Sequence, residues 1–411
     1  MATAVTVMAG IAFGGLGLQG LTGRAAAVDR ARAETTDLVR LQTIRTKVVT
    51  ADAAAGVDVL LGRNQVTQTP NDYAWALQPA VIGMAIASRQ ADDAYPLAVT
   101  NLRLAQYTGQ VGAARNLSVS GNAGEAATVL TAAAGTLQAQ ILPRLLAVQR
   151  ASESRLAADQ DDAARGPLLA YGGAGLGLIA LIGVQLWLTA RTRRILNVPL
   201  VVASALLAAM TVAGLVIVTT SQQRADVVST GVQPLVRQLV EARVAAFNAR
   251  SVETLSVVAS NEAAQDVSWR AWLAAAQAAL ARAQQAAPAT PPHPGADAPQ
   301  AEVVTAVSLL GDYVKVHDGM VRQALLPRTP TNRAGEVVLA TSAAPDGLPG
   351  AFDAFDVATG ALLARQVEAA DNGWAGAGAN LVLAGWLWLV AGLGAAVLAW
   401  RGLAARLREY D

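Results

Sequence analysis

Few side chains of this sequence could carry out chemistry. The chain has no cysteine and only two histidines, which excludes cysteine nucleophiles, disulfides and multi-histidine metal centres. His317, in the stretch YVKVHD (313–318), could act as a general base, but no nucleophile or metal ligand lies at helical spacing from it. We therefore expect His317 to be a structural or surface residue, and His293, which stands between prolines, to be a loop residue.

Two other patterns are compatible with chemistry at first sight. Asp353 and Asp356 in AFDAFD (351–356) could form a pair of acidic groups, but their spacing beside two phenylalanines is more typical of the amphipathic face of a helix. The glycine-rich run GGLGLQG (14–20) lies in an apolar segment with no strand before it, so it is not a phosphate-binding loop. The residues predict no catalytic site, no metal and no cofactor, and we expect the protein not to be an enzyme.

The composition is typical of a membrane protein. Hydrophobic residues make up 53% of the 411 residues and charged residues 15%, which is too apolar for an ordinary soluble domain. The formal net charge is +1, so nucleic acid is not an expected partner. A bilayer core of about 30 Å needs about 20 apolar residues. Four charge-free segments meet that requirement: 1–22, 168–190, 198–220 and 378–400.

The break between the second and third segments (191–197) is basic. A charged residue at the bilayer centre costs about 2.5–3.5 kcal/mol, so this break must be a turn at one membrane surface. Because cytoplasmic loops are enriched in Lys and Arg, we expect this turn and the C-terminal tail (401–411) to be cytoplasmic. The basic residues behind this expectation are Arg191, Arg193, Arg194, Arg401, Arg406 and Arg408.

With four spans, the two long segments 23–167 and 221–377 both lie outside a plasma membrane. The basic residues Arg24, Arg30 and Arg32 follow the first span and oppose this orientation, but the two basic cytoplasmic sites outweigh them. A cleaved signal peptide over residues 1–27 is the alternative for the first span, since three alanines could suit a peptidase.

Both external segments carry helical patterns and almost no strand signal. Apolar residues step by three and four from Leu41 to Ala55 in the first segment and from Val228 to Leu239 in the second. Turn-forming residues divide the first segment into four helices, and the second into about four less regular ones. We therefore expect an all-α membrane protein with four transmembrane helices and two extracytoplasmic sensor domains like four-helix bundles.

Small and aromatic residues in the spans suggest how the spans pack. Glycines four residues apart let two helix backbones approach closely, although glycine is also tolerated in lipid without such a contact. The pairs are Gly10 with Gly14 and Gly173 with Gly177. The fourth span carries three tryptophans that could anchor it at the membrane interface: Trp386, Trp388 and Trp400.

The whole chain resembles the actinobacterial GlnX-type membrane protein family. The resemblance is strongest in AFDAFDVATGALLARQVEAA (351–370) and in the tail GLAARLREY (402–410). It also includes AQYTGQVGAARN (105–116), ILPRLLAVQ (141–149) and TARTRRILNVPLVVASALL (189–207). This resemblance implies a four-span transducer between an extracytoplasmic amino-acid-binding lipoprotein, GlnH, and the cytoplasmic Ser/Thr kinase PknG. Aspartate and glutamate would be the stimulus.

The short cytoplasmic parts leave little room for an effector domain. One hypothesis is that Arg191, Arg193 and Arg194, together with Arg401, Arg406, Arg408 and Tyr410, form a docking surface for the kinase. The alternative is that these residues only set the topology and contact lipid headgroups.

Two other functions stay open. The first is a sensor that binds a small molecule directly, with Tyr107, Arg115 and Asn116 as contacts for a ligand or for the lipoprotein. The second is a structural envelope protein without a ligand. The sequence also leaves open whether two copies form a homodimer.

Overall fold

A computed structural model describes residues 2–62, 72–192, 198–259, 262–289, 297–327 and 329–407. Helices dominate these residues, and no strand occurs among them. The helices in chain order are α1 (Ala2–Leu61), α2 (Asp72–Ala87), α3 (Ala91–Val119), α4 (Ala123–Thr136), α5 (Leu142–Thr192), α6 (Val198–Val227), α7 (Gln233–Ala259), α8 (Glu262–Ala286), α9 (Pro299–Ala324), α10 (Pro330–Thr341), α11 (Leu348–Gly378) and α12 (Leu381–Leu407). Two π-helical turns, η2 (Leu137–Ile141) and η3 (Val228–Val232), join α4 to α5 and α6 to α7.

The apolar composition and the helices together make this an all-α membrane protein. Three continuous helical stretches are long and apolar enough to cross a membrane: Ala4–Leu61, Val198–Ala259 and Leu348–Ala404. They contain the first, third and fourth expected spans. The second expected span, 168–190, contains a shorter apolar helical stretch, Tyr171–Trp187.

The chain forms two compact units. The span unit comprises Met1–Thr35, Ser154–Val228 and Asp371–Asp411, and the bundle unit comprises Thr36–Glu153 and Ser229–Ala370. Most of each long segment, expected as one of two extracytoplasmic bundles, therefore lies in this one compact unit. The chain passes between the units four times, within α1, α5, η3 and α11.

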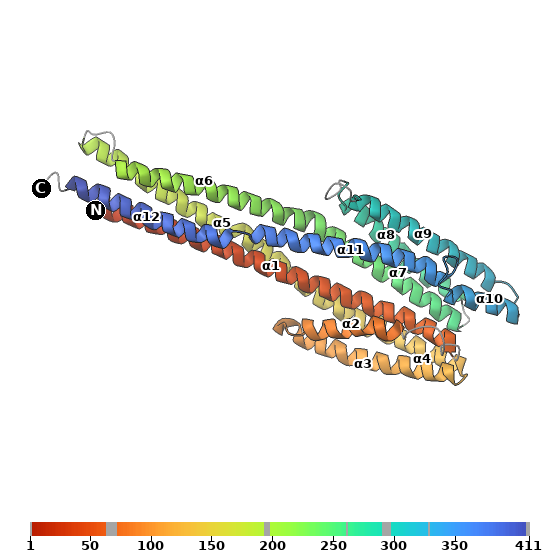
Figure 1. The fold of residues 1–411 in the computed structure, drawn as a ribbon. Helices are drawn as coiled ribbons and strands as arrows, with labels where there is room; N and C mark the ends of the chain where they lie inside the picture. The colour runs from red at the N-terminus through yellow and green to blue at the C-terminus, as the bar shows by residue number, and fades with distance from the viewer. Residues whose placement is uncertain are drawn as a thin grey trace. The chain divides into compact units, whose positions relative to one another are not determined.

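In the span unit, α1, α5, α6 and α12 run alongside one another (Figure 1). The four glycines expected at helix contacts lie at close approaches. A Cβ atom on Gly10 would lie 2.8 Å from the Gly392 carbonyl oxygen of α12, and one on Gly14 would lie 3.0 Å from that of Leu389. Gly173 and Gly177 face Leu16 and Phe13 of α1, at 2.7 and 3.1 Å.

The structure corrects the expectation that all three tryptophans are interfacial anchors. Trp386 and Trp400 are each 55% exposed, but Trp388 is only 1% exposed. Its ring stacks on Phe13 with centroids 4.8 Å apart. Gly17 and Gly214 border the same ring, because a Cβ atom on either would overlap it. Trp388 is therefore a core residue between α1, α6 and α12.

Charged residues just beyond the apolar part of the span unit are paired within that unit. Arg24 is buried and donates to Ser221 Oγ at 3.1 Å. Arg30 pairs with Asp159 at 2.7 Å. Arg32 donates two hydrogen bonds to the Asp371 carboxylate, at 2.6 and 2.7 Å.

In the bundle unit, α2, α3 and α4 lie on one side of α1 and α7, and α8, α9 and α10 lie on the other (Figure 1). The apolar stripe of α1, which includes Leu41, Ile44 and Val48, is buried in a core that also takes residues from α7 and α9. Burial of this shared core holds helices of both long segments together in the bundle unit.

Candidate functional site

Helix α7 carries an unusual number of buried polar side chains. Asn248, Ser251, Glu253 and Arg250 are all at most 8% exposed. Buried polar groups need hydrogen-bond partners, because an unpaired group costs free energy on desolvation. The partners of α7 come from both long segments; for example, Gln138 Nε2 donates to Asn248 Oδ1 at 2.7 Å.

The first polar cluster lies between α1, α3 and α7. Asp52 of α1 accepts a hydrogen bond from the Tyr107 hydroxyl of α3 at 3.0 Å and another from the Ser251 hydroxyl of α7. All three side chains are buried. This carboxylate thus connects two helices of the first long segment to one of the second. The sequence offered a weak signal for it, namely an acidic residue inside the alanine-rich run ADAAAG (51–56).

The three residues expected as a ligand or lipoprotein contact occupy different environments on α3. Tyr107 is fully buried against Asp52, and burial raises the pKa of its hydroxyl well above the ordinary value of 10. Arg115 is half-buried, with its guanidinium 3.4 Å from the Asp58 carboxylate. Asn116 is exposed. The arrangement gives Tyr107 a structural role and leaves Arg115 and Asn116 as surface candidates.

Replacing Asp52 by asparagine is expected to remove a pH dependence of stability. Burial raises the pKa of Asp52, against the opposing effect of the hydrogen bonds from Ser251 and Tyr107. The folded protein therefore binds this proton more tightly than the unfolded chain does. As the pH rises from the ordinary value of 3.8 through the raised value, the parent protein loses stability. The uncharged asparagine should not show this decline when the free energy of unfolding is measured across the acidic range.

Asp52→Ala provides the control for that experiment. It deprives the buried Tyr107 and Ser251 hydroxyls of their acceptor, so it should lower the free energy of unfolding by about 1–3 kcal/mol at every pH. If the parent protein and Asp52→Asn showed the same pH dependence, burial of the charge at Asp52 would not be the cause.

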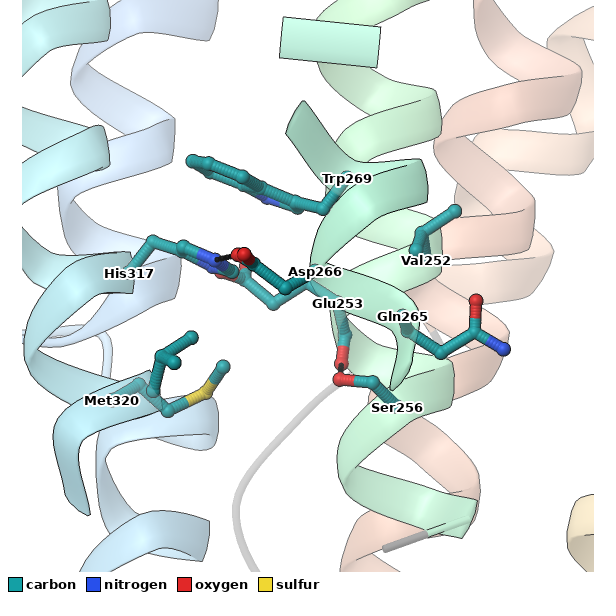
Figure 2. A pocket seen from close by; sticks show the side chains of 9 residues that line it. Val252, Glu253, Ser256, Gln265, Asp266, Trp269, His317 and Met320 are labelled. Carbon is teal, nitrogen blue, oxygen red and sulfur yellow. Dashed lines mark hydrogen bonds and ion pairs between the residues drawn. The ribbon is translucent and has the colours of Figure 1, made fainter. Parts of the chain in front are cut away.

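The second polar cluster lies between α7, α8 and α9, around His317 (Figure 2). His317 Nδ1 is 2.5 Å from Glu253 Oε1, and Nε2 is 3.2 Å from Asp266 Oδ1. The Tyr313 hydroxyl donates to the other Glu253 oxygen at 2.7 Å, and Trp269 Nε1 donates to that hydroxyl at 3.3 Å. His317 is buried, which agrees with the structural role expected from the sequence and not with the alternative of a surface position. Its carboxylate partners were not anticipated.

The His317 cluster is closely packed. The imidazole lies flat on the Trp269 indole, with ring centroids 3.4 Å apart and planes inclined by 3°. The space enclosed by these side chains holds no water-sized cavity. Within the part of the chain that the structure describes, no group of three or more His, Cys, Asp or Glu side chains could hold a metal ion. The cluster is thus a closely packed polar contact between three helices of the bundle unit.

The third polar cluster explains the stretch AFDAFDVATG (351–360). Arg243 Nη1 donates to the Asp356 carbonyl at 2.6 Å and to Thr359 Oγ1 at 2.7 Å. Its Nη2 pairs with the Asp356 carboxylate. A Cβ atom on Gly360 would lie 3.1 Å from Nη1, so glycine gives the guanidinium room. Asp356 is thus part of a packing interaction between α7 and α11, in line with the expected amphipathic face.

A shallow apolar groove lies between α1 and α2. Trp75, Ile82 and Ile86 line it together with Ile44 and Arg40, and its volume is about 400 Å³. Arg40 pairs with Asp37 on its own helix. A groove of this composition offers apolar contacts and few polar ones.

The residues expected at the cytoplasmic surface are only partly within the described chain. Arg401 is exposed on α12. Arg191 and Arg406 lie near the last residues of α5 and α12. Arg193, Arg194, Arg408 and Tyr410 lie outside the described residues, as does His293. The docking surface stays a prediction.

Comparison with known proteins gives one family. Residues 27–161 match the model of the actinobacterial sensor domain. The match starts within α1, just after the apolar part of that helix, and ends within α5, just before its apolar part. No curated protein and no solved structure matches the chain. The family match supports a sensing or signalling role for this membrane protein.

Proposed function

We propose that this protein is a transmembrane signal transducer that reports extracytoplasmic aspartate or glutamate to a cytoplasmic Ser/Thr kinase. The observation that carries the proposal is the position of the sensor-domain match. The matched residues 27–161 begin and end in the two helices, α1 and α5, that also carry apolar segments of the span unit. A relay of this kind needs no catalytic activity of its own.

Helix connectivity supports the relay. The bundle unit is joined to the span unit by four chain crossings, each within a helix or a π-helical turn. A helix transmits an axial shift or rotation better than a flexible loop, since its backbone is hydrogen-bonded throughout. An allosteric coupling of about 1–3 kcal/mol between the two ends would suffice.

The proposed orientation places the multi-pass protein in the plasma membrane with the bundle unit outside. The basic residues after the first apolar segment had opposed this orientation. Arg24, Arg30 and Arg32 all have partners in the span unit, two of them with acidic side chains. Because the positive-inside rule counts Lys and Arg whatever their partners, the proposed orientation requires the basic turn 191–197 and tail 401–411 to outweigh these three arginines.

The choice of a lipoprotein as the amino-acid receptor rests on the GlnX-type resemblance. A specific structural feature disfavours the alternative, direct binding by α3. Tyr107 is turned into the core, and the groove beside α2 is apolar and ill-suited to an acidic amino acid. An amino acid bound to a separate lipoprotein requires no such pocket in this chain.

The test is crosslinking of the full-length protein in membranes, with and without added aspartate or glutamate, followed by identification of the captured proteins. We expect a solute-binding lipoprotein and a Ser/Thr kinase, with the amount of at least one changing with the amino acid. Recovery of neither protein would overturn the relay. Calorimetric titration of the purified protein with aspartate would then test the direct sensor.

A variant of the C-terminal tail tests the predicted docking surface for the kinase. Triple replacement of Arg406, Arg408 and Tyr410 by alanine should abolish kinase recovery and leave membrane insertion and lipoprotein recovery unchanged. Lys315→Ala, which removes an exposed charge in the bundle unit, is the control and should change none of the three. If the triple variant retained the kinase, these residues would serve topology and lipid contact only.

A further inference from the structure

Both ring nitrogens of His317 face carboxylate oxygens. Nδ1 lies 2.5 Å from Glu253 Oε1 and Nε2 lies 3.2 Å from Asp266 Oδ1. A neutral imidazole has one N–H group and one lone pair, so it can donate to only one of two ionised carboxylates. The other contact would then set a nitrogen lone pair against an oxygen lone pair. With both carboxylates ionised, two favourable hydrogen bonds require a second proton on the ring. The contacts of Glu253 suit an ionised carboxylate, since its Oε2 accepts from the Tyr313 hydroxyl and lies 3.9 Å from Arg250 Nη1.

Four helices contribute charged groups around His317. Helix α7 contributes Glu253 and Arg250, whose Nη1 lies 3.9 Å from Glu253 Oε2. Helix α8 contributes Asp266 and Arg270. Helix α9 contributes Tyr313, Asp318, which pairs with Arg270 at 3.2 Å, and Arg322, whose Nε donates to the Asp318 carbonyl at 3.1 Å. On α10, Arg333 and Glu336 pair with each other at 3.0 Å.

The carboxylates that face His317 are Glu253 and Asp266. The arginine nearest to Glu253 is Arg250, whose Nη1 lies 3.9 Å from Oε2. Glu253 is only 1% exposed, and a protonated imidazole 2.5 Å away compensates its buried charge more closely than Arg250 does.

The aromatic surroundings favour the same state. His317 lies face to face on Trp269 at a centroid distance of 3.4 Å. The negative electrostatic potential of an indole face stabilises a cation over it, more so when water is excluded. Because the cluster holds no water-sized cavity, its proton is held by protein groups alone.

We propose that the Glu253–His317–Asp266 cluster is a proton-binding site that couples the packing of α8 and α9 to the pH of the solvent around the bundle unit. With the proton bound, His317 donates from Nδ1 to α7 and from Nε2 to α8. When a base in the solvent takes a proton, it leaves from Nε2, because Asp266 is 23% exposed and Glu253 is 1% exposed. The Nε2 lone pair then faces the Asp266 carboxylate, and the repulsion loosens the start of α8 from α9.

The test uses the scarcity of histidine in this chain. His293→Asn leaves His317 as the only histidine, so full-length protein labelled with [15N]histidine in lipid nanodiscs gives one set of ring signals. We expect both ring nitrogens to be protonated at neutral pH and Nε2 to lose its proton at a higher pH. Hydrogen exchange of the first turns of α8 should rise over the same interval, after correction for the intrinsic pH dependence of exchange.

Two asparagine variants discriminate the proton site from a merely structural cluster. Asp266→Asn removes the carboxylate that faces Nε2 and should weaken proton binding at His317 by at least tenfold. Asp318→Asn removes a carboxylate bonded to the same arginine, Arg270, but not to His317, and should change it much less. A neutral imidazole in the parent at neutral pH would overturn the proposal. An equal change of proton affinity at His317 in the two variants would overturn it as well. His317→Gln is less informative, because it can fail to fold.

Discussion

Replacing Gly17 by valine should destabilise the span unit strongly. A Cβ atom at position 17 would overlap the six-membered part of the Trp388 ring. The ring has little freedom to move, since Phe13 stacks on it and Gly214 of α6 borders it, with a Cβ there 2.5 Å from Trp388 Cζ2. Overpacking a well-packed core typically costs about 1–3 kcal/mol, and a rigid aromatic neighbour favours the upper end.

The neighbouring Gly15 provides the matched control. A Cβ atom at Gly15 would meet no atom within 4 Å, so Gly15→Val should change the free energy of unfolding by less than about 0.5 kcal/mol. Both variants have the same change in helix propensity and hydrophobicity. Unfolding of the full-length protein in mixed micelles, titrated with a denaturing detergent, measures the difference. Equal losses for the two variants would show that Trp388 does not fill this space.

The spans were largely predictable, but the role of Trp388 was not. Hydropathy along the chain located the apolar segments. The spacing of four residues between glycines located the pairs that permit close contact. Hydropathy does not show which side of a span faces protein. Trp388 and Trp386 are two residues apart and thus lie about 200° apart around the helix, which places one in the core and the other outside.

The fusion of the two long segments into one unit was not predictable for a related reason. The helical stripe of α1 shows that Leu41 and Ile44 face a partner, but not which helix that partner is. The deciding contacts join residues far apart in sequence. Asp52 meets Ser251 across 199 positions, and Arg45 meets Glu241 across 196. Spacing within a single helix cannot predict pairs of this kind.

Spacing within a helix also failed to predict the partners of His317. No partner lies at helical spacing from it, because its carboxylate partners are 64 and 51 positions away on α7 and α8. A more general signal was present. A buried polar residue on a largely apolar helix face needs a partner from another helix. That rule would have directed attention to Asp52, Glu253 and His317 together, without naming their partners.

Replacing Arg243 by methionine is expected to cost about 3 kcal/mol of folding free energy. The change keeps an unbranched apolar stem that reaches about as far as Nε, but it removes the two hydrogen bonds and the ion pair that hold α11 against α7. Removing one partner of a buried ion pair leaves the other uncompensated, which typically costs 3–5 kcal/mol. The lower value applies here because the Asp356 side chain is 33% exposed and water can solvate it.

Arg365→Met is the matched control for this substitution. Arg365 also joins two helices of the bundle unit, through a pair with Glu302 at 2.5 Å, but its side chain is 55% exposed. Exposed pairs contribute about 0–1 kcal/mol, so the control should lose much less stability in the same denaturation experiment. If both variants lost the same amount, the buried contact of Arg243 would contribute no more than a surface pair.

Arg243 also offers a test of how the relay works. It joins α7 to α11, and both helices lead into the span unit, through η3 and through α11 itself. An amino-acid signal that depends on these two helices moving together should weaken in Arg243→Met at a temperature where the variant is still folded. The measurement is the aspartate-dependent change in kinase recovery, with Arg365→Met alongside. An unchanged response in a folded Arg243→Met variant would assign the signal to α1 and α5, the helices that bracket the sensor-domain match.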